Sequence, residues 1–144
     1  MTESQTVTGI IEAALHVEGV ARSMDFYREL FGFEEELRKD AIGVLRVLGR
    51  QALILFPRSI VQQSVITPAN AIEGTIPPHG ASGRMNVAFS IHAEDLDPWR
   101  QRLAVRGVKI EGTVRWKRGG TSIYFRDPDE HLIELITPGL WSFY

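Results

Sequence analysis

The residues of this chain best suited to chemistry are two carboxylates placed inside apolar, strand-like segments. Glu12 lies in IIEAAL and Glu134 lies in LIELI, and the alternation of each segment turns the carboxylate away from its apolar neighbours. A carboxylate in an apolar cavity is costly unless it is paired, hydrogen-bonded or coordinated. Two carboxylates aimed into one cavity repel each other, and a divalent cation is the simplest partner that keeps both ionised.

Further residues with suitable side chains lie around these strands. His16 shares a face with Glu12, but four residues along a strand span about 13 Å, so we expect His16 to touch a substrate rather than share an ion. Trp116 and Tyr124 lie on the two strands of a predicted hairpin, VRWKRGGTSIYF, and are candidates to line a binding pocket. Lys117 or Arg118 would meet an anionic substrate there, unless the hairpin tip is simply solvated.

The composition excludes several classes of function. The 144 residues carry a net charge of −2, which provides no basic field for nucleic acid or anionic membranes. The chain has no cysteine, which excludes disulfides, thiolate metal sites and thiol nucleophiles. Because we find no signal-peptide pattern and no apolar run of membrane-spanning length, we expect a soluble, cytoplasmic protein.

The elements that must position the candidate residues occur twice in the same order. A strand at 10–17 is followed by a helical pattern that closes at Gly32, and the second half repeats this with MNVAFSI and a helix that closes at Gly107. Three strand-like runs follow each helix: FEEELRK, IGVLRVL and ALILFP in the first half, and VKIEGTVRW, SIYFRD and LIELITP in the second. The sequence therefore predicts two βαβββ modules produced by tandem duplication.

We expect a single domain over 1–144. Module one covers about 10–57, a connecting loop 58–83, module two about 84–138 and a C-terminal tail 139–144. The connection is rich in Pro and Gly, and a loop this long suggests a linker that also acts as a lid. The apolar tail, TPGLWSFY, should pack on the domain or on a partner copy. RDPDE is predicted to be a turn, and His92 and His131 are assigned surface or turn roles.

Three segments together resemble the vicinal oxygen chelate superfamily, which includes glyoxalase, bleomycin-resistance, fosfomycin-resistance and extradiol-dioxygenase proteins. They are ARSMDFYRELFGF, NVAFSI and IYFRDPDEHLIELITP, in this order over nearly the whole chain. The resemblance implies an α+β, glyoxalase-like fold, in which two tandem βαβββ modules form a partly closed mixed β-barrel with helices outside. Relatives commonly form homodimers, and some exchange modules between chains.

The resemblance also implies a metal site. Its ligand positions, on the first strand of each module and the last strand of the second, fall on Glu12, Asn86 and Glu134, and Ser90 shares the face of Asn86. The fourth symmetric position falls on or near Leu53, which cannot coordinate. A histidine is more familiar where Asn86 stands, and amide oxygen favours Mg²⁺, Mn²⁺ or Ca²⁺, although Ni²⁺ and Zn²⁺ stay open. His79 either touches a substrate or folds back from the loop to supply a nitrogen ligand.

Two functions follow from this site. The first is a metal-dependent enzyme of the glyoxalase type, with lyase, isomerase or group-transfer chemistry on a small oxygenated substrate and with Glu134 or Glu12 moving a proton. An Fe²⁺ dioxygenase is disfavoured because these positions lack two histidines. The second is a metal-free binding protein of the bleomycin-resistance type, in which Arg126 or backbone donors satisfy the carboxylates.

Overall fold

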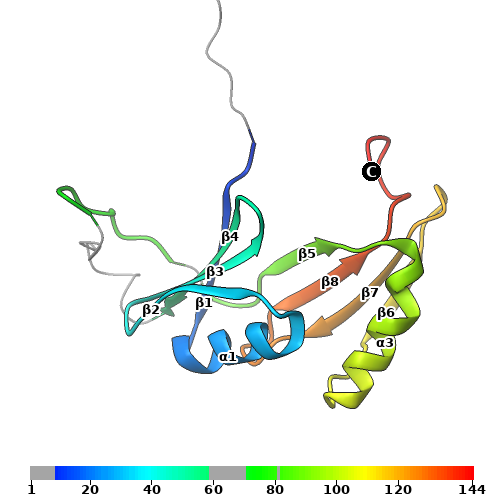
Figure 1. Ribbon diagram of the computed structural model, residues 1–144, viewed down its shortest axis with the longest axis horizontal. Helices are drawn as coiled ribbons and strands as arrows, with labels where there is room; N and C mark the ends of the chain where they lie inside the picture. Colours follow the sequence, from blue (N-terminus) through cyan, green and yellow to red (C-terminus); the bar gives the residue numbers. More distant parts are fainter. Residues whose placement is uncertain (1–8, 59–70, 81) are drawn as a thin grey trace, which may run out of the picture.

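The computed structural model describes residues 9–58, 71–80 and 82–144, and these form two βαβββ modules (Figure 1). The first contains β1 (Glu12–Val17), α1 (Val20–Phe31), β2 (Glu34–Lys39), β3 (Ile42–Leu48) and β4 (Gln51–Pro57). The second contains β5 (Asn86–Ser90), a short 3₁₀ turn (Ala93–Asp95), α3 (Leu96–Val105), β6 (Gly112–Arg115), β7 (Thr121–Arg126) and β8 (Leu132–Ile136). The predicted repeat of strand, helix and three strands is confirmed.

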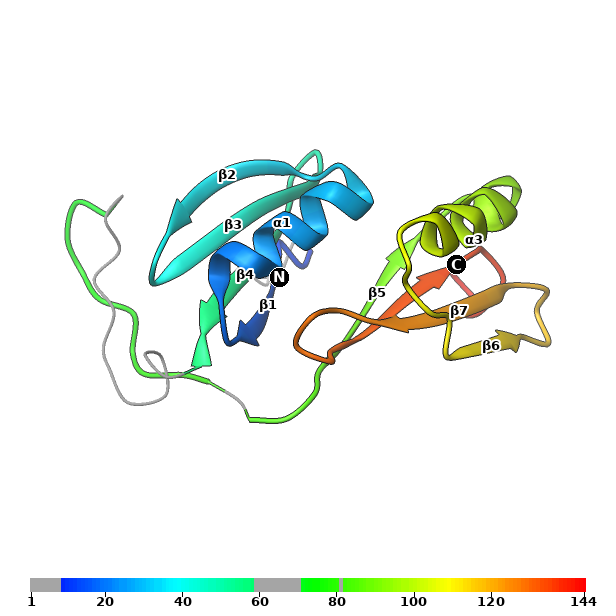
Figure 2. The ribbon, with the colours of Figure 1, turned by 90° about the horizontal axis from the view of Figure 1, so that it is seen from below.

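Each module forms its own four-stranded mixed sheet, in the order β1-β4-β3-β2 and β5-β8-β7-β6. The first strand runs parallel to the last, and the other pairings are antiparallel. The predicted α+β fold is therefore confirmed, although the two sheets stay separate and do not close into a barrel within the described chain (Figure 2). β1 and β5 are both edge strands, so neither completes a barrel by pairing with the other module.

A single apolar core joins the two modules on the helix side of the sheets. Its buried members come from both helices and both sheets: Leu15, Val17, Val20, Met24, Tyr27, Leu30, Leu45, Leu53, Leu55, Leu103, Ile123, Phe125, Ile133 and Leu135. At the junction, the ring of Phe31 lies 5.1 Å from Phe89 and 5.4 Å from Trp99, centroid to centroid. Aromatic contacts between the modules therefore hold them in one arrangement.

Two glycines explain how α1 ends and how closely it docks. Gly32 adopts a left-handed conformation (φ 75°), and its N–H donates to the carbonyl of Arg28, which terminates the helix as predicted. Gly43 lies under the helix, where an added Cβ would come within 2.6 Å of the Met24 sulfur and 2.9 Å of a Val20 methyl. A side chain at this position would therefore push α1 away from β3.

The register of β4 refines the expectation for the fourth symmetric position. Leu53 pairs with Ala13 and Leu45 and faces the core, with 1% of its surface exposed. The residue equivalent to Glu134 is Ile54, because Ile54 pairs with Ala14 as Glu134 pairs with Ala88. A shift of one residue along a strand moves a side chain to the other face, so the position lies one residue beyond Leu53. Neither side chain can bind a metal.

The C-terminal tail packs against the end of the second sheet. The Gly120 N–H donates to the Gly139 carbonyl, and the Tyr144 hydroxyl donates to the Ile136 carbonyl at 2.9 Å. The β6–β7 hairpin is present as predicted, but its turn covers Lys117, Arg118 and Gly119 rather than Gly119 and Gly120, and Gly119 has a positive φ of 104°. Of the connecting loop, residues 59–70 and 81 lie outside the described residues, and so does the N-terminal segment 1–8. Within the described part of the chain, no helix is long and apolar enough to cross a membrane.

Candidate functional site

The candidate site lies on the face of the second sheet that points away from the helices. Glu134 pairs with Ala88 on one side and with Tyr124 on the other, so these three side chains form one row across the sheet. The flanking residues of β8, Ile133 and Leu135, are fully buried in the core, as the alternation predicts. Asn86 lies two residues before Ala88 on β5, and it therefore shares the face of Glu134 on the neighbouring strand.

Glu134 is a buried carboxylate held by a hydroxyl group. It is 7% exposed, and its Oε2 accepts a hydrogen bond from Ser122 Oγ at 2.5 Å. Ser122 is completely buried, and its oxygen in turn accepts from the indole Nε1 of Trp116 at 2.8 Å. Arg126, the cation considered above, is paired instead with Glu111 and with the Glu130 carbonyl. The negative charge of Glu134 is therefore not matched by that arginine.

A pocket of about 480 Å³ opens beside Glu134. It is lined by Trp116, Lys117, Arg118, Tyr124, Glu134, Leu140 and Trp141. Burial raises the pKa of Tyr124, and the negative charge of Glu134 raises it further, so the phenol stays protonated beside the carboxylate. The structure therefore brings the predicted pocket residues Trp116 and Tyr124 together with Glu134 and with the two hairpin cations.

Glu12 does not line the pocket beside Glu134. It stands on the edge strand β1, is exposed, and lines a different pocket of about 200 Å³ between the two sheets, together with Ala52, Val87 and Ala88. Asn86 and Ser90 are exposed on β5. Across residues 9–58, 71–80 and 82–144, no group of three His, Cys, Asp or Glu side chains is arranged to hold a metal ion. Because Glu12 lines this pocket and Glu134 lines the pocket beside Trp116, the two carboxylates do not share a pocket within one chain.

His16 and His79 are brought together against the first sheet. His16 Nε2 lies 3.2 Å from His79 Nδ1, and the ring of Phe56 packs against both imidazoles. His16 is 6% exposed and its pKa is lowered, first by burial and then by the electrostatic effect of its neighbours His79, His131 and Arg58. His79 thus contacts the far end of β1 from Glu12, which favours the substrate-contact alternative over the ligand alternative.

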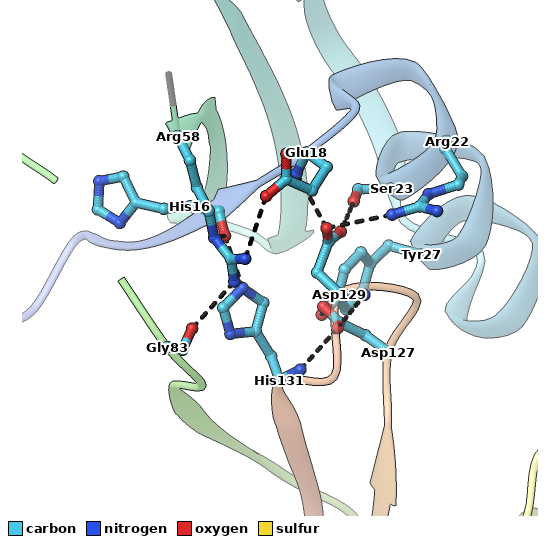
Figure 3. A network of polar contacts seen from close by, with 10 residues as sticks. All are labelled: His16, Glu18, Arg22, Ser23, Tyr27, Arg58, Gly83, Asp127, Asp129 and His131. Atoms are coloured by element: carbon cyan, nitrogen blue, oxygen red, sulfur yellow. Dashed lines mark hydrogen bonds and ion pairs between the residues drawn. The ribbon is translucent and has the colours of Figure 1, made fainter. Parts of the chain in front are cut away.

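The Asp127–His131 turn, which the sequence pattern predicts as a plain turn, holds the two modules together (Figure 3). Asp129 accepts hydrogen bonds from the Glu18 N–H at 2.9 Å, from Ser23 Oγ at 3.0 Å and from Arg22 at 3.1 Å. These donors lie at the start of α1, in the other module. The predicted turn is correct, but its role between modules was missed, because no local pattern indicates partners more than a hundred residues away.

The neighbouring residues of this turn add further contacts. Tyr27 on α1 donates to Asp127 Oδ2 at 2.7 Å, and both groups are buried. His131 is completely buried, and its Nδ1 accepts from the Met85 N–H at 2.9 Å. Its Nε2 therefore carries the proton and donates to the His16 carbonyl at 2.7 Å. The assignment of His131 to the turn is correct, but it lies in the interior between the modules rather than at the surface.

The fold agrees with comparisons to known proteins. Residues 9–135 match the model of the Glyoxalase/Bleomycin resistance protein/Dioxygenase superfamily. The chain belongs to this superfamily. A solved structure of lactoylglutathione lyase from Agrobacterium tumefaciens is 29% identical, with a TM-score of 0.82 over 96% of this chain and 100% of that one.

Two curated relatives match over most of their length. Metallothiol transferase FosB of Bacillus licheniformis is 26% identical over 141 residues, covering 97% of this chain and 82% of the relative. Metallothiol transferase FosB of Staphylococcus haemolyticus is 28% identical, covering 93% and 86%. The names of these relatives are those of enzymes, in agreement with the expectation of an enzyme. FosX of Listeria monocytogenes, solved with Mn(II) and sulfate, shares the fold at 22% identity and a TM-score of 0.64 over 92% of this chain and 91% of that one.

Proposed function

We propose that this protein is a metal-dependent enzyme of the superfamily that acts on a small, anionic, oxygen-rich substrate. The observation that carries the proposal is Glu134, a buried carboxylate on the open face of the second sheet, bonded to the Ser122 hydroxyl. A buried charge is costly without a counter-charge. A cation bound on this face would supply it, and Lys117 and Arg118 at the same pocket would attract an anionic substrate.

The proposed ligands are Glu12, Asn86 and Glu134, which are all oxygen donors. Such a set suits hard ions, so we expect Mn²⁺ or Mg²⁺ rather than Zn²⁺ or Ni²⁺. The ion would polarise neighbouring oxygens of the substrate and stabilise an enolate or oxyanion. With three protein ligands, positions remain open for the substrate or water.

We further propose that the site is shared between two copies in a homodimer. Glu12 and Glu134 line different pockets of one chain, and Glu12 is exposed on an edge strand. In this arrangement, Glu12 of one copy would meet Asn86 and Glu134 of the other. The first sheet of one copy would then form the opposite wall of the pocket, with its apolar inner face toward the substrate.

Within such a site, the chain's own groups have separate tasks. Glu134 or Glu12 would accept and return a proton, which is efficient only within hydrogen-bonding reach of the substrate. Tyr124, protonated beside Glu134, would donate a hydrogen bond to a substrate oxygen. His16, His79 and Ser90 would contact the part of the substrate that does not react. The names of the relatives indicate substrates to assay: fosfomycin together with a thiol such as glutathione, and lactoylglutathione.

A second candidate function is a metal-free binding protein of the bleomycin-resistance type. Two observations favour it: Asn86 is neutral, and the inner face of the first sheet is apolar, with Ile54 and Phe56 packed beside Ala14, Ile42, Val44 and Ile76. A protein that only sequesters a ligand needs such a wall and no ion. The buried Glu134 argues for the enzyme.

Elemental analysis separates the two functions. The protein, purified without chelator or affinity-tag metals, would be incubated with Mn²⁺ or Mg²⁺, dialysed and analysed, together with Glu12→Gln and Asn86→Ala. We expect about one ion per site in the parent chain and loss of metal in both variants. A parent chain that retains no metal while it binds small ligands would support sequestration and overturn the enzyme.

A mixing experiment tests the shared site. Chains carrying Glu12→Gln and chains carrying Glu134→Gln would be co-expressed with different tags, and the mixed dimer would be purified. If each site takes Glu12 from one copy and Glu134 from the other, one of the two sites in the mixed dimer is intact. We then expect about half of the normal metal content and activity. Mixed dimers without any metal, or a strictly monomeric protein, would contradict the shared site.

A further inference from the structure

The hydrogen bonds behind Glu134 run in one fixed direction. An indole N–H can only donate, so Trp116 Nε1 donates to Ser122 Oγ, at 2.8 Å. The single hydroxyl proton of Ser122 is then available to Glu134 Oε2, at 2.5 Å. The hydrogen bonds therefore run from Trp116 to Ser122 and from Ser122 to Glu134, and they engage one oxygen of the carboxylate, Oε2. Tyr124, which lines the same pocket, is the other polar neighbour of this carboxylate.

The burial of Ser122 makes this contact hard to replace. Its side chain is completely buried, so water has no access to its hydroxyl. A hydrogen bond to a charged acceptor is short and about twice as strong as a bond between neutral groups. Both features restrict rotation of the carboxylate about its last bond. Ser122 touches the carboxylate but not the open part of the pocket, where the substrate would lie.

The first sheet serves as an internal comparison. There, Ile54 stands at the place of Glu134, and Val44 pairs with it as Tyr124 pairs with Glu134. Ile42 precedes Val44 by two residues, as Ser122 precedes Tyr124, and it packs against Ile54 and Phe56. The hydroxyl is therefore present in the module that has the carboxylate and absent at the matching place of the module that lacks it.

We propose that Ser122, oriented by Trp116, is a positioning residue that holds Glu134 Oε2 so that Oε1 faces the divalent cation of the proposed site. This inference rests on the proposed function, because it needs a cation at Glu134. Groups that hydrogen-bond to a metal ligand orient the ligand and raise its affinity for the metal, and their loss typically weakens metal binding about 10- to 100-fold. Ser122, which does not line the pocket, would play this part without touching the substrate.

The test measures Mn²⁺ affinity rather than turnover. Free Mn²⁺ would be titrated by electron paramagnetic resonance with the parent protein, Ser122→Ala and Glu134→Gln, and the melting temperature of each metal-free protein would be recorded. We expect Glu134→Gln to abolish binding and Ser122→Ala to raise the Kd at least tenfold. Thr137→Val is the matched control, because it also removes a buried hydroxyl, bonded to Thr121 and not to Glu134. It should leave the Kd unchanged even if it lowers the melting temperature.

Trp116→Phe keeps the test decisive if Ser122→Ala does not fold. It removes the indole donor to Ser122 and also shortens one wall of the pocket, and we expect a smaller rise of the Mn²⁺ Kd in the same direction. If the folded Ser122→Ala and Trp116→Phe variants have a Kd within twofold of the parent value while Glu134→Gln loses the ion, the positioning role of Ser122 is overturned. The proposed metal site at Glu134 would still be supported by that result. A parent protein that binds no Mn²⁺ would overturn the proposed function and this inference together.

Discussion

The inner faces of the two sheets have the same frame but opposite chemistry. In the first sheet, the row that crosses β1, β4 and β3 contains Ala14, Ile54 and Val44. In the second, the matching row contains Ala88, Glu134 and Tyr124. The strands pair in the same register at this row, so the difference within the row lies in the side chains. One sheet provides an apolar wall and the other a polar site.

The two faces are also bordered by different segments. Ile76 and His79, from the described part of the connecting loop, pack on the first sheet at Phe56. Leu140 and Trp141, from the C-terminal tail, line the pocket of the second. Both segments lie outside the repeated unit of five elements. The repeated frame therefore does not determine the shape of the site by itself, since segments added to each module complete it.

Replacing the carboxylate should give the largest effect. Glu134→Gln keeps the size of the side chain but removes its charge, so we expect activity to fall about 10³-fold, within the range for loss of an acid–base or metal-binding group. The measurement is kcat/KM on whichever substrate the assays identify. Ile54→Val at the matching place of the first sheet only trims one methyl group from the apolar wall and should lower kcat/KM less than tenfold, and equal losses in both variants would break the comparison.

Placing a charge on the apolar wall should destabilise the protein. Ile54→Glu puts a carboxylate among the apolar side chains of Ile42, Val44 and Phe56, and we expect a loss of about 3 kcal/mol in the free energy of unfolding. Glu134→Leu, the reverse change in the second sheet, removes a buried charge but leaves the buried Ser122 hydroxyl without its acceptor, so we expect a smaller loss than for Ile54→Glu. Urea denaturation measures both, and a stable Ile54→Glu would show that the wall already holds a cation or water.

The relative position of the two faces depends on the hydrogen bonds between the Asp127–His131 turn and the first module. Asp129→Asn weakens the bonds to Ser23, Arg22 and the Glu18 N–H, and we expect a loss of about 2 kcal/mol in the free energy of unfolding. Asp40→Asn is the matched control on an exposed turn, and it should change stability by less than about 0.5 kcal/mol. Equal, small changes in the two variants would contradict the role of the turn between modules.

A smaller effect, on the pH dependence of stability, is expected from His16 at the far end of the first sheet. Because the pKa of His16 is lowered in the folded protein, the unfolded chain takes up the proton first as the pH falls. Its contribution to stability is therefore complete above about pH 6.5, the ordinary pKa of histidine, and is lost as the pH falls from there through the lowered value. Melting temperatures between pH 7.5 and 5 measure the slope.

The control for this prediction is the exposed histidine of the second module. His16→Gln should flatten the fall of the melting temperature below pH 6.5, whereas His92→Gln should leave it as in the parent protein. If the slope persists in His16→Gln, the titration belongs to another group, and His79 or His131 would be tested next.

The local order of elements could be predicted from the sequence because its signals are local. Alternation in LIELI is enough to turn Glu134 away from the core, and Gly32 marks the end of α1. Prediction is less reliable where one residue changes the outcome, since a single step along β4 separates Leu53 in the core from Ile54 on the open face. At such a position, the pairing of the strands determines whether the side chain faces the core or the open face.

Sequence alone determined the two modules, the ends of their helices and the open-face position of Glu134, because spacing and glycine act over a few residues. Only the tertiary structure decided that Glu12 lines another pocket, that Ser122 supports Glu134 and that Asp129 meets the start of α1. These contacts depend on how sheets and helices pack. A hydroxyl or carboxylate has the same local pattern whether its partner is solvent, a neighbouring strand or the other module.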